Sequence, residues 1–280
     1  MKNLNRLYQE YGEYNILYNQ LNMPSPSVEH SWRRTKKLLH DELLKIINRL
    51  IINDHKKQII ISDIGCGNGA LLIRLAESTR SHSQKIVYRG FEISSPFVNY
   101  ANRAVKYKNL TNISFHNFDV EKDNFSDKSD IVICSEVLEH LHKPKQVINK
   151  IYQTIDNGGY LLLSTPNSKN LIKYPFLFLK KIVSKKDSKE LGKFLTNKER
   201  EFKLADLEQH LYVFSHGELI ALLKEVGFSV YKTPRSTTLF GGPFLDNHIS
   251  LFSLTIILDY LFDAIRIPQV GWDIIAFAKK

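Results

Sequence analysis

Apolar runs of strand length recur between residues 57 and 167, and polar or glycine-containing stretches separate them. These runs begin at Ile59, Ile86, Ile113, Asp130 and Gly158. Helical periodicity follows the first two runs, over about 71–75 and 95–106. Strands that alternate with helices predict a parallel sheet with helices on both faces. The pattern therefore predicts an α/β fold with a doubly wound sheet.

Further elements are expected on both sides of this region. Residues 1–30 carry an amphipathic helical stripe that a Pro-rich stretch at 23–27 breaks, and Trp32–Ile52 carries a second one. We therefore expect residues 1–56 to form N-terminal helices. After the alternating region, Ser215 begins a helix with Glu218 in the capping-box position and Gly227 at its end. A sixth strand follows from Phe228, and Gly271–Ala278 has the pattern of a last strand.

Two inserts, at 168–210 and 239–267, interrupt this order. The first lies after the fifth strand, at the carboxyl end of the sheet where α/β proteins bind ligands, and it is a candidate substrate lid. In the second, Ile249–Ile265 is apolar, but Asp259 and Asp263 argue against a membrane crossing. We expect a helical cap over the substrate pocket there. An interfacial helix on a membrane surface and a dimer-forming helix are the alternatives.

A glycine-rich loop follows the first strand. Asp63 ends the strand, and Gly65, Gly67 and Gly69 alternate before the next helix. Such a loop lets the backbone approach a ligand closely, and the first turn of the helix offers free N–H groups. The spacing differs from the Gly-x-Gly-x-x-Gly of dinucleotide-binding enzymes, and no Lys-Ser/Thr follows as a phosphate loop requires. The loop therefore predicts a nucleotide-like ligand of another class.

The sequence Asp63-x-Gly-x-Gly-x-Gly after an Ile-rich strand resembles motif I of the class I S-adenosylmethionine-dependent methyltransferases. Later motifs follow in the order of that family, and the resemblance covers roughly residues 33–235 plus the last strand. It implies a Rossmann-like, mostly parallel sheet of seven strands with the last strand antiparallel. It also implies that residues 57–280 form the methyltransferase domain and that the N-terminal helices contribute to a lid.

The resemblance further implies how S-adenosyl-L-methionine is held. Glu92, at the tip of the second strand, would accept hydrogen bonds from the two ribose hydroxyls. Asp119 and Val120, after the third strand, stand where family members grip the adenine. The expected cofactor-binding residues are Asp63, Gly65, Cys66, Gly67, Gly69, Glu92, Ile93, Asp119, Val120 and Ser135.

Candidate catalytic residues follow the fourth strand, in Glu136-x-x-Glu139-His140. If this segment is helical, the three side chains share a face. All three would hold a divalent ion such as Mg²⁺, or His140 would act without metal as a base or as a substrate-positioning group. A purely structural role of these residues is the third alternative. The string resembles the ubiquinone-pathway O-methyltransferases and also the small-RNA 2′-O-methyltransferases, in which a later histidine completes the metal site. His210 is the candidate for that later ligand and for substrate contact.

Asn167 and His142 are further polar residues near the same strand ends. The Asn167 amide, after Thr165-Pro166, is expected to face the cleft, where it orients substrate or holds the loop. His142 is expected to be an exposed loop residue. Cys66, although beside the cofactor loop, is better explained as a small buried residue than as a reactive thiol.

Composition narrows the setting. The chain has 280 residues, 43% hydrophobic and 24% charged, as in an ordinary globular protein. Two cysteines make disulfides improbable, and no apolar run follows Met1, so we expect a cytoplasmic protein without a transmembrane segment. The net charge of +10 is compatible with nucleic acid or anionic lipid. Without an array of stacking aromatics, we favour solvated surface.

The sequence thus favours a methyltransferase that acts on a small-molecule acceptor, with oxygen as the expected acceptor atom. An RNA 2′-O-methyltransferase with a divalent metal is one alternative, and a non-catalytic cofactor-binding protein is another. Peripheral membrane contact stays open, as does the choice between a monomer and a homodimer.

Overall fold

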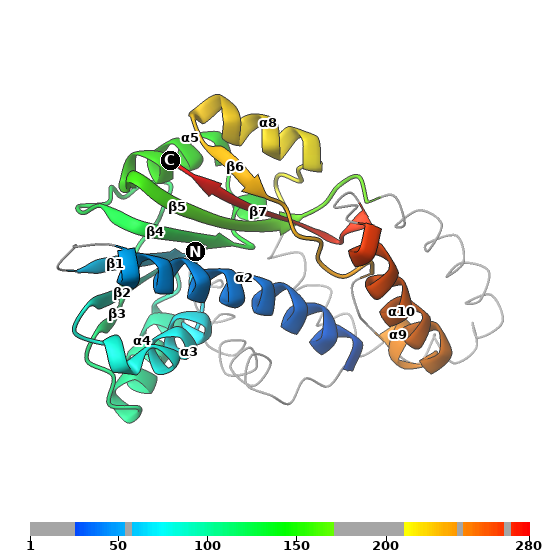
Figure 1. The fold of residues 1–280 in the computed structure, drawn as a ribbon, viewed down its shortest axis with the longest axis horizontal. Helices are drawn as coiled ribbons and strands as arrows, with labels where there is room; N and C mark the ends of the chain where they lie inside the picture. The colour runs from blue at the N-terminus through cyan, green and yellow to red at the C-terminus, as the bar shows by residue number, and fades with distance from the viewer. Residues whose placement is uncertain (1–25, 54–57, 171–209, 240–242, 266–269) are drawn as a thin grey trace.

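The computed structural model describes residues 26–53, 58–170, 210–239, 243–265 and 270–280. The helix expected within residues 1–25 and most of the candidate lid at 168–210 lie outside the described residues. Figure 1 shows the fold. The strands are β1 (Ile59–Ile64), β2 (Ile86–Glu92), β3 (Ile113–Asn117), β4 (Ser129–Ser135), β5 (Ile155–Pro166), β6 (Ser229–Lys232) and β7 (Asp273–Lys279). The helices are α2 (Pro26–Asn53), α3 (Ala70–Ser78), α4 (Ser95–Tyr107), α5 (Pro144–Thr154), α8 (His216–Val226), α9 (Pro243–Asp246) and α10 (Ile249–Ile265), with short 3-10 turns η1 (Arg80–His82) and η2 (Leu138–His140).

The strands form one sheet in the order β3-β2-β1-β4-β5-β7-β6. Neighbouring strands from β3 to β5 are parallel, whereas β7 pairs antiparallel with both β5 and β6. This confirms the predicted seven-stranded, mostly parallel sheet with an antiparallel last strand. The strand order reverses between β1 and β4, and in such sheets ligands bind outside the carboxyl ends of the strands at that point.

Helices cover both faces of the sheet, as Figure 1 shows. The buried apolar side chains of α2, α3 and α4 pack on one face, including Leu39, Leu72 and Val98. Those of α5 and α8 pack on the other face, including Ile148 and Leu219. The central strands are therefore covered on both sides, which explains why β4 is buried along its whole length.

Local signals place several element ends. Ser215 caps α8 with the predicted capping box, and Gly227 ends the helix in the left-handed conformation. The expected start of the second helix at Trp32 was too late, because α2 already begins at Pro26. Proline is well tolerated in the first turn of a helix, where its missing N–H costs no hydrogen bond.

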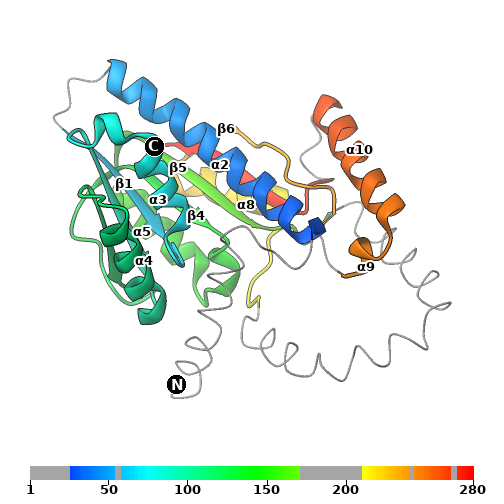
Figure 2. The ribbon, with the colours of Figure 1, turned by 90° about the horizontal axis from the view of Figure 1, so that it is seen from below.

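The second insert is partly described and contains α9 and α10. Figure 2 shows both helices beside the start of α2, at the end of the sheet toward which the parallel strands run. The Asp246 carboxylate in α9 accepts a hydrogen bond from the Ser27 N–H of α2 at 3.0 Å. No helix of the described residues combines the length and the apolar character needed to cross a bilayer.

Candidate functional site

The glycines of the loop after β1 have different surroundings and therefore different roles. A Cβ at Gly65 would lie 2.3 Å from Val137 Cγ2, and one at Gly69 would lie 2.3 Å from Phe115 Cζ, so both are required for internal packing. A Cβ at Gly67 would meet no described atom within 4 Å, although its φ is +54°. The loop therefore leaves open space at Gly67, where a bound group can approach the backbone.

The acid at the tip of β2 is joined to this loop. One Glu92 carboxylate oxygen accepts from the Gly67 N–H at 2.9 Å and the other accepts from the Ser94 N–H at 2.8 Å. Burial raises the pKa of Glu92, and these two N–H donors oppose that rise. Each carboxylate oxygen keeps a second lone pair, so both can still accept from ligand hydroxyls.

Two buried polar atoms near the same loop make no hydrogen bond to the described residues. The Asn68 Nδ2 and the Ser94 Oγ are buried and have no hydrogen-bond partner among the described residues. Buried polar groups are almost always hydrogen-bonded in proteins, so orphaned atoms beside an open glycine fit a site built for a polar ligand. Asp63 lies behind the loop, and burial raises the pKa of its carboxyl to about 7. These residues fit the nucleoside and amino-acid parts of S-adenosylmethionine.

The other expected cofactor residues are placed as follows. Ile93 is exposed beside Glu92, as an apolar contact for a base would require. Asp119 accepts hydrogen bonds from the Glu121 N–H at 3.0 Å and the Lys122 Nζ at 2.6 Å, so it holds the turn after β3. Val120 packs into the core. Burial raises the pKa of the Cys66 thiol well above its usual value, which agrees with a structural role.

The second half of the site follows β4. The structure overturns the expected helix across Glu136, because this residue has φ +58° and only Leu138–His140 form a helical turn. The Glu136 carboxylate accepts from the Ser164 Oγ of β5 at 2.6 Å. Glu136, Glu139 and His140 therefore do not share a face.

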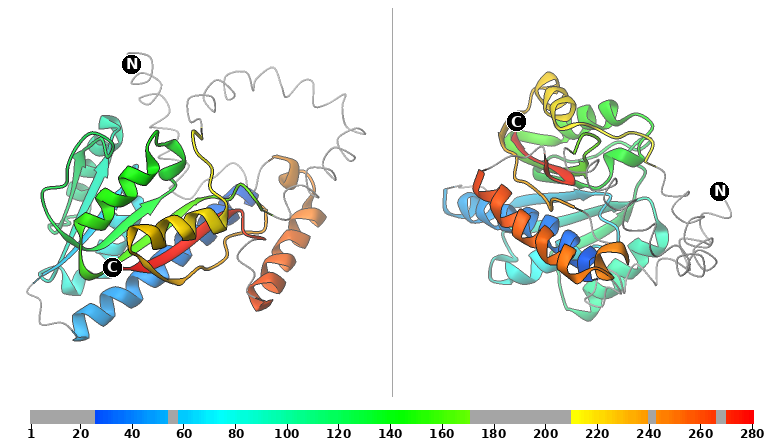
Figure 3. Two further views of the ribbon diagram at one scale, coloured as in Figure 1. Left: turned by 90° about the horizontal axis from the view of Figure 1, so that it is seen from above. Right: turned by 90° about the vertical axis from the view of Figure 1, so that its right-hand side faces the viewer.

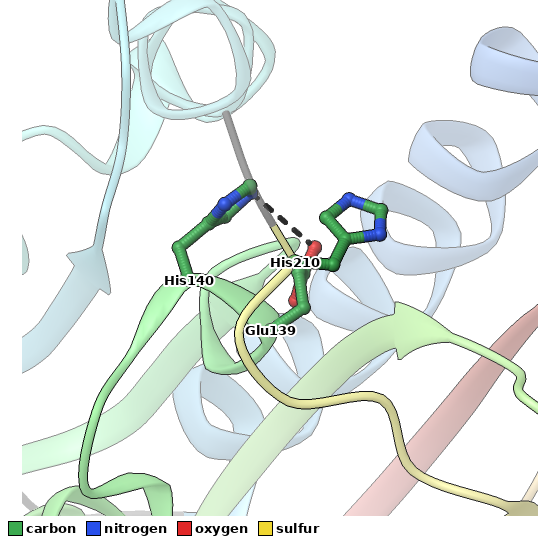
Figure 4. Close-up of side chains that lie close together, drawn as sticks. All are labelled: Glu139, His140 and His210. Atoms are coloured by element: carbon green, nitrogen blue, oxygen red, sulfur yellow. Dashed lines mark ion pairs between the residues drawn. The ribbon is translucent and has the colours of Figure 1, made fainter. Parts of the chain in front are cut away.

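The structure instead gathers Glu139, His140 and His210. Figure 4 shows the three side chains converging, with His210 supplied by the segment that precedes α8. One potential ligand atom from each residue lies within 4.8 Å of the others. The segment after His210 is positioned by the Glu139 carbonyl, which accepts from the Leu211 N–H at 2.7 Å and the Tyr212 N–H at 3.1 Å.

Burial sets the electrostatics of this group. Desolvation first, and the charge of Glu136 second, raise the pKa of Glu139 to about 8. The Glu139 carboxyl also accepts from the Thr165 Oγ1 at 2.9 Å, and its other oxygen lies 3.8 Å from the His140 Nε2. His140 is exposed, so a partly exposed base stands over a buried acid.

Lys36 of α2 was not anticipated as a site residue. Its Nζ donates to the Ser135 Oγ at 3.0 Å, and that hydroxyl is 2.9 Å from the Ser164 Oγ. Its charge lowers the pKa of Glu136 and Glu139 against the effect of burial. Lys36 lies within the apolar stripe of α2. A lysine on an otherwise apolar helix face is the signal by which the sequence could have revealed it.

Asp273 of β7 is the other unforeseen group. Burial and then the charge of Glu136 raise its pKa, and it accepts from the Thr35 Oγ1 of α2 at 3.0 Å.

Of the two roles expected for Asn167, its hydrogen bonds fit the one in which it holds the loop. It is buried, its amide donates to the Gly271 carbonyl at 3.1 Å, and it accepts from the Lys169 N–H at 3.1 Å. His142 is exposed, as expected.

Comparison with known proteins agrees with this arrangement. The methyltransferase domain family matches residues 55–214, more than half of the chain. The chain belongs to this family. Proteins with different names are similar to it. A ubiquinone biosynthesis O-methyltransferase of Coxiella burnetii is 28% identical over 163 residues, 55% of this chain and 64% of that protein. A carboxy-S-adenosyl-L-methionine synthase of Helicobacter hepaticus is 29% identical over 173 residues, 61% of this chain and 68% of that protein.

The mitochondrial ubiquinone biosynthesis O-methyltransferase of Candida albicans is 25% identical over 63% of this chain and 58% of that protein. The chain thus spans about three-fifths of the length of the ubiquinone-pathway relatives it matches. Among solved structures, magnesium protoporphyrin IX methyltransferase from Synechocystis PCC 6803 with bound SAM has a TM-score of 0.58 at 16% identity, over 100% of this chain and 96% of that one. This likeness shows a shared fold.

Proposed function

We propose that the protein transfers a methyl group from S-adenosylmethionine to an oxygen of a small-molecule acceptor. The observation that carries the proposal is the position of His140 and buried Glu139 after β4, on the same sheet edge as the open Gly67 loop. The names of the ubiquinone-pathway relatives support an oxygen acceptor.

The cofactor half of the site would hold S-adenosylmethionine. Glu92 would accept from the ribose hydroxyls, Gly67 would allow close approach, and Asn68 and Ser94 would find the partners they lack among the described residues. Ile93, Asp119 and Val120 would flank the adenine. When bound, S-adenosylmethionine supplies an activated methyl group on a sulfonium.

The acceptor half would supply positioning and a base. The His140 Nε2 would take the proton of the acceptor hydroxyl, and the Glu139 carboxyl 3.8 Å away would, in its ionised form, stabilise the resulting imidazolium. Alignment of the two reactants contributes much of the acceleration, on the order of 7–11 kcal/mol in well-oriented systems. The helical cap that contains α9 and α10 and the segment 168–210 would exclude water.

A second candidate is metal-assisted transfer to a hydroxyl, including an RNA 2′-hydroxyl, and the grouping of Glu139, His140 and His210 favours it. One carboxylate and two imidazoles suit Mn²⁺, Fe²⁺ or Zn²⁺ better than Mg²⁺, which prefers oxygen ligands. Such an ion would lower the pKa of the acceptor hydroxyl. Glu136 would support this site only from behind, because its carboxylate is turned to Ser164.

One experiment separates these candidates. Transfer of a radiolabelled methyl group would be measured with hydroxylated aromatic acceptors and with short RNA, with and without EDTA. A base mechanism predicts no effect of EDTA, a loss of 10²–10⁴-fold in His140→Ala, and near-normal activity in His210→Ala. A metal mechanism predicts loss with EDTA, recovery with Mn²⁺, and parallel losses in His140→Ala and His210→Ala.

The matched control is His142→Ala, since His142 is an exposed histidine two residues from His140 and lies outside the cluster. Full activity in both His140→Ala and His210→Ala would defeat both chemical roles and leave alignment as the source of catalysis. Tight S-adenosylhomocysteine binding without transfer to any acceptor would instead support the non-catalytic alternative.

A further inference from the structure

Helix α10 departs from the usual rule for a surface helix, because it buries an acid, Asp259, and exposes large apolar side chains. Asp259 is buried and accepts from the Arg235 Nη1 at 3.0 Å and from the Thr238 N–H at 2.6 Å. The Arg235 Nη2 also donates to Asp263 at 2.9 Å, and His30 of α2 lies 3.2 Å from Asp259. A network of buried charges therefore fixes which side of α10 points inward.

The opposite face of α10 is exposed and mostly apolar, and the small residues Ser250 and Ser253 also lie on it. Its large exposed side chains are Ile249 (74%), Leu254 (48%), Ile257 (55%), Tyr260 (73%) and Leu261 (57%). At 100° per residue these five positions fall within an arc of about 140°. Figure 3 shows α10 on the outside of the molecule, away from the sheet. A contiguous apolar face of this kind marks an interaction surface.

The spacing on this face is that of a helix–helix seam. Leu254, Ile257 and Leu261 are separated by three and four residues, and Ser250 and Ala264 extend the same 4-3-4-3 series at both ends. Apolar residues at alternating spacings of three and four are the pattern that packs one helix against another. The seam is nearly symmetric about Ile257, with small residues at its ends and larger ones at its centre.

The charges on α10 argue for a protein rather than an anionic lipid surface. Helices that lie on membranes carry Lys and Arg beside their apolar face, whereas α10 contains neither between residues 249 and 265. Its charged residues, Asp259 and Asp263, are both acidic and pair with arginines from outside the helix, so α10 itself offers anionic headgroups no positive charge. The seam itself carries no charge, so two identical seams can meet without repulsion.

We propose that this face is the interface between two copies of the chain, with α10 packed antiparallel against the α10 of the partner. A two-fold axis near Ile257 brings each Leu254 opposite the partner's Leu261, because the same patch serves both copies. The paired helices would run alongside each other for about 25 Å. The inward network through Arg235 would hold each helix in the required orientation.

The mass of the full chain in solution tests the interface. Light scattering after size exclusion should give twice the 32.5 kDa of one chain for the wild type. Ile257→Glu places a charge at the centre of the seam and should raise the dissociation constant at least 100-fold, to give a monomer with an unchanged melting temperature. Tyr107→Glu is the matched control, because Tyr107 is an exposed aromatic residue on α4, and it should stay dimeric.

Disulfide formation tests the orientation. Ile257→Cys should cross-link to itself under mild oxidation, whereas Ser250→Cys should not, because an antiparallel pair separates the two copies of residue 250. Cross-linking of Ser250→Cys would show a parallel pair and overturn the proposed geometry. A monomeric wild type at 100 µM would overturn the interface. A monomeric wild type whose sedimentation with phosphatidylglycerol vesicles depends on Ile257 would also overturn the interface. That result would assign the face to lipid.

Discussion

The two halves of the candidate site share one sheet edge but are built differently. The cofactor half comes from two short stretches, the loop from Asp63 to Gly69 and the turn from Glu92 to Ser94, and its acid is held by backbone N–H groups. The acceptor half comes from α2, the ends of β4 and β5, the segment before α8, and β7. Its acids are held by hydroxyls and by the charge of Lys36.

This difference indicates how cofactor binding and methyl transfer should respond to substitutions in each half. The cofactor half depends on backbone shape, so a single side chain that fills the loop should remove binding. The acceptor half depends on the balance between buried acids and one lysine, so its losses should be smaller and should vary with the partner removed.

The largest effect is expected at the open glycine. Gly67→Val should lower the affinity for S-adenosylhomocysteine at least 100-fold, because its side chain fills the space in which no described atom lies within 4 Å. The loss of stability should be limited to the left-handed strain, about 1–2 kcal/mol. Calorimetric titration and thermal unfolding measure the two quantities.

Gly69→Val is the contrasting variant. Its Cβ would lie 2.3 Å from Phe115 Cζ, so overpacking is added to the strain and the melting temperature should fall further than in Gly67→Val. Unaltered S-adenosylhomocysteine affinity in Gly67→Val would remove the loop from the cofactor site.

A smaller effect is expected at Lys36. Lys36→Met removes the hydrogen bond to the Ser135 Oγ and the charge that faces Glu136 and Glu139, and methyl transfer should fall about tenfold. Lys37→Met is the matched control, because the adjacent Lys37 is exposed and pairs with Asp41. Equal activity in the two variants would show that Lys36 does not position the acceptor half.

The last effect concerns the pH dependence of stability rather than binding or activity. Burial raises the pKa of Asp63 from 3.8 to about 7, so between these values the folded chain keeps a proton that the unfolded chain has lost. Stability from this group is therefore present at low pH and is lost as pH rises through this window, by less than about 1.4 kcal/mol per pH unit. Asp63→Asn should lose stability less steeply between pH 4 and pH 7 than the wild type.

Urea unfolding across that pH range makes the measurement, and Asp41→Asn serves as the control. The Lys37 hydrogen bond lowers the pKa of Asp41, so its contribution is lost only as pH falls toward the acid side. A wild type and an Asp63→Asn variant with parallel profiles would show that Asp63 ionises normally in the folded chain.

The errors of sequence interpretation fall on the acceptor half. The i, i+3 and i, i+4 spacing of Glu136, Glu139 and His140 indicates a shared helical face only if the backbone is helical. Glu136 has a left-handed φ of +58°, and its carboxylate is bound by Ser164 of the neighbouring strand. Lys36 and Asp273 were not predicted as site residues, because the hydrophobic periodicity of their segments predicts only a helix and a strand. It gives no sign that either side chain reaches the site.

The sequence by itself determined the sheet with its helices, the capping of α8 and the glycine loop, because hydrophobic period, capping residues and glycine conformations act within a few residues of each other. The family resemblance named His210 as a candidate partner of Glu139 and His140, but only the tertiary structure brings it to them, since a backbone contact between distant segments positions it. The tertiary structure also decided which face of α10 is outward. Both faces of that helix are largely apolar, and Arg235, outside the helix, pairs with Asp259 and holds it inward.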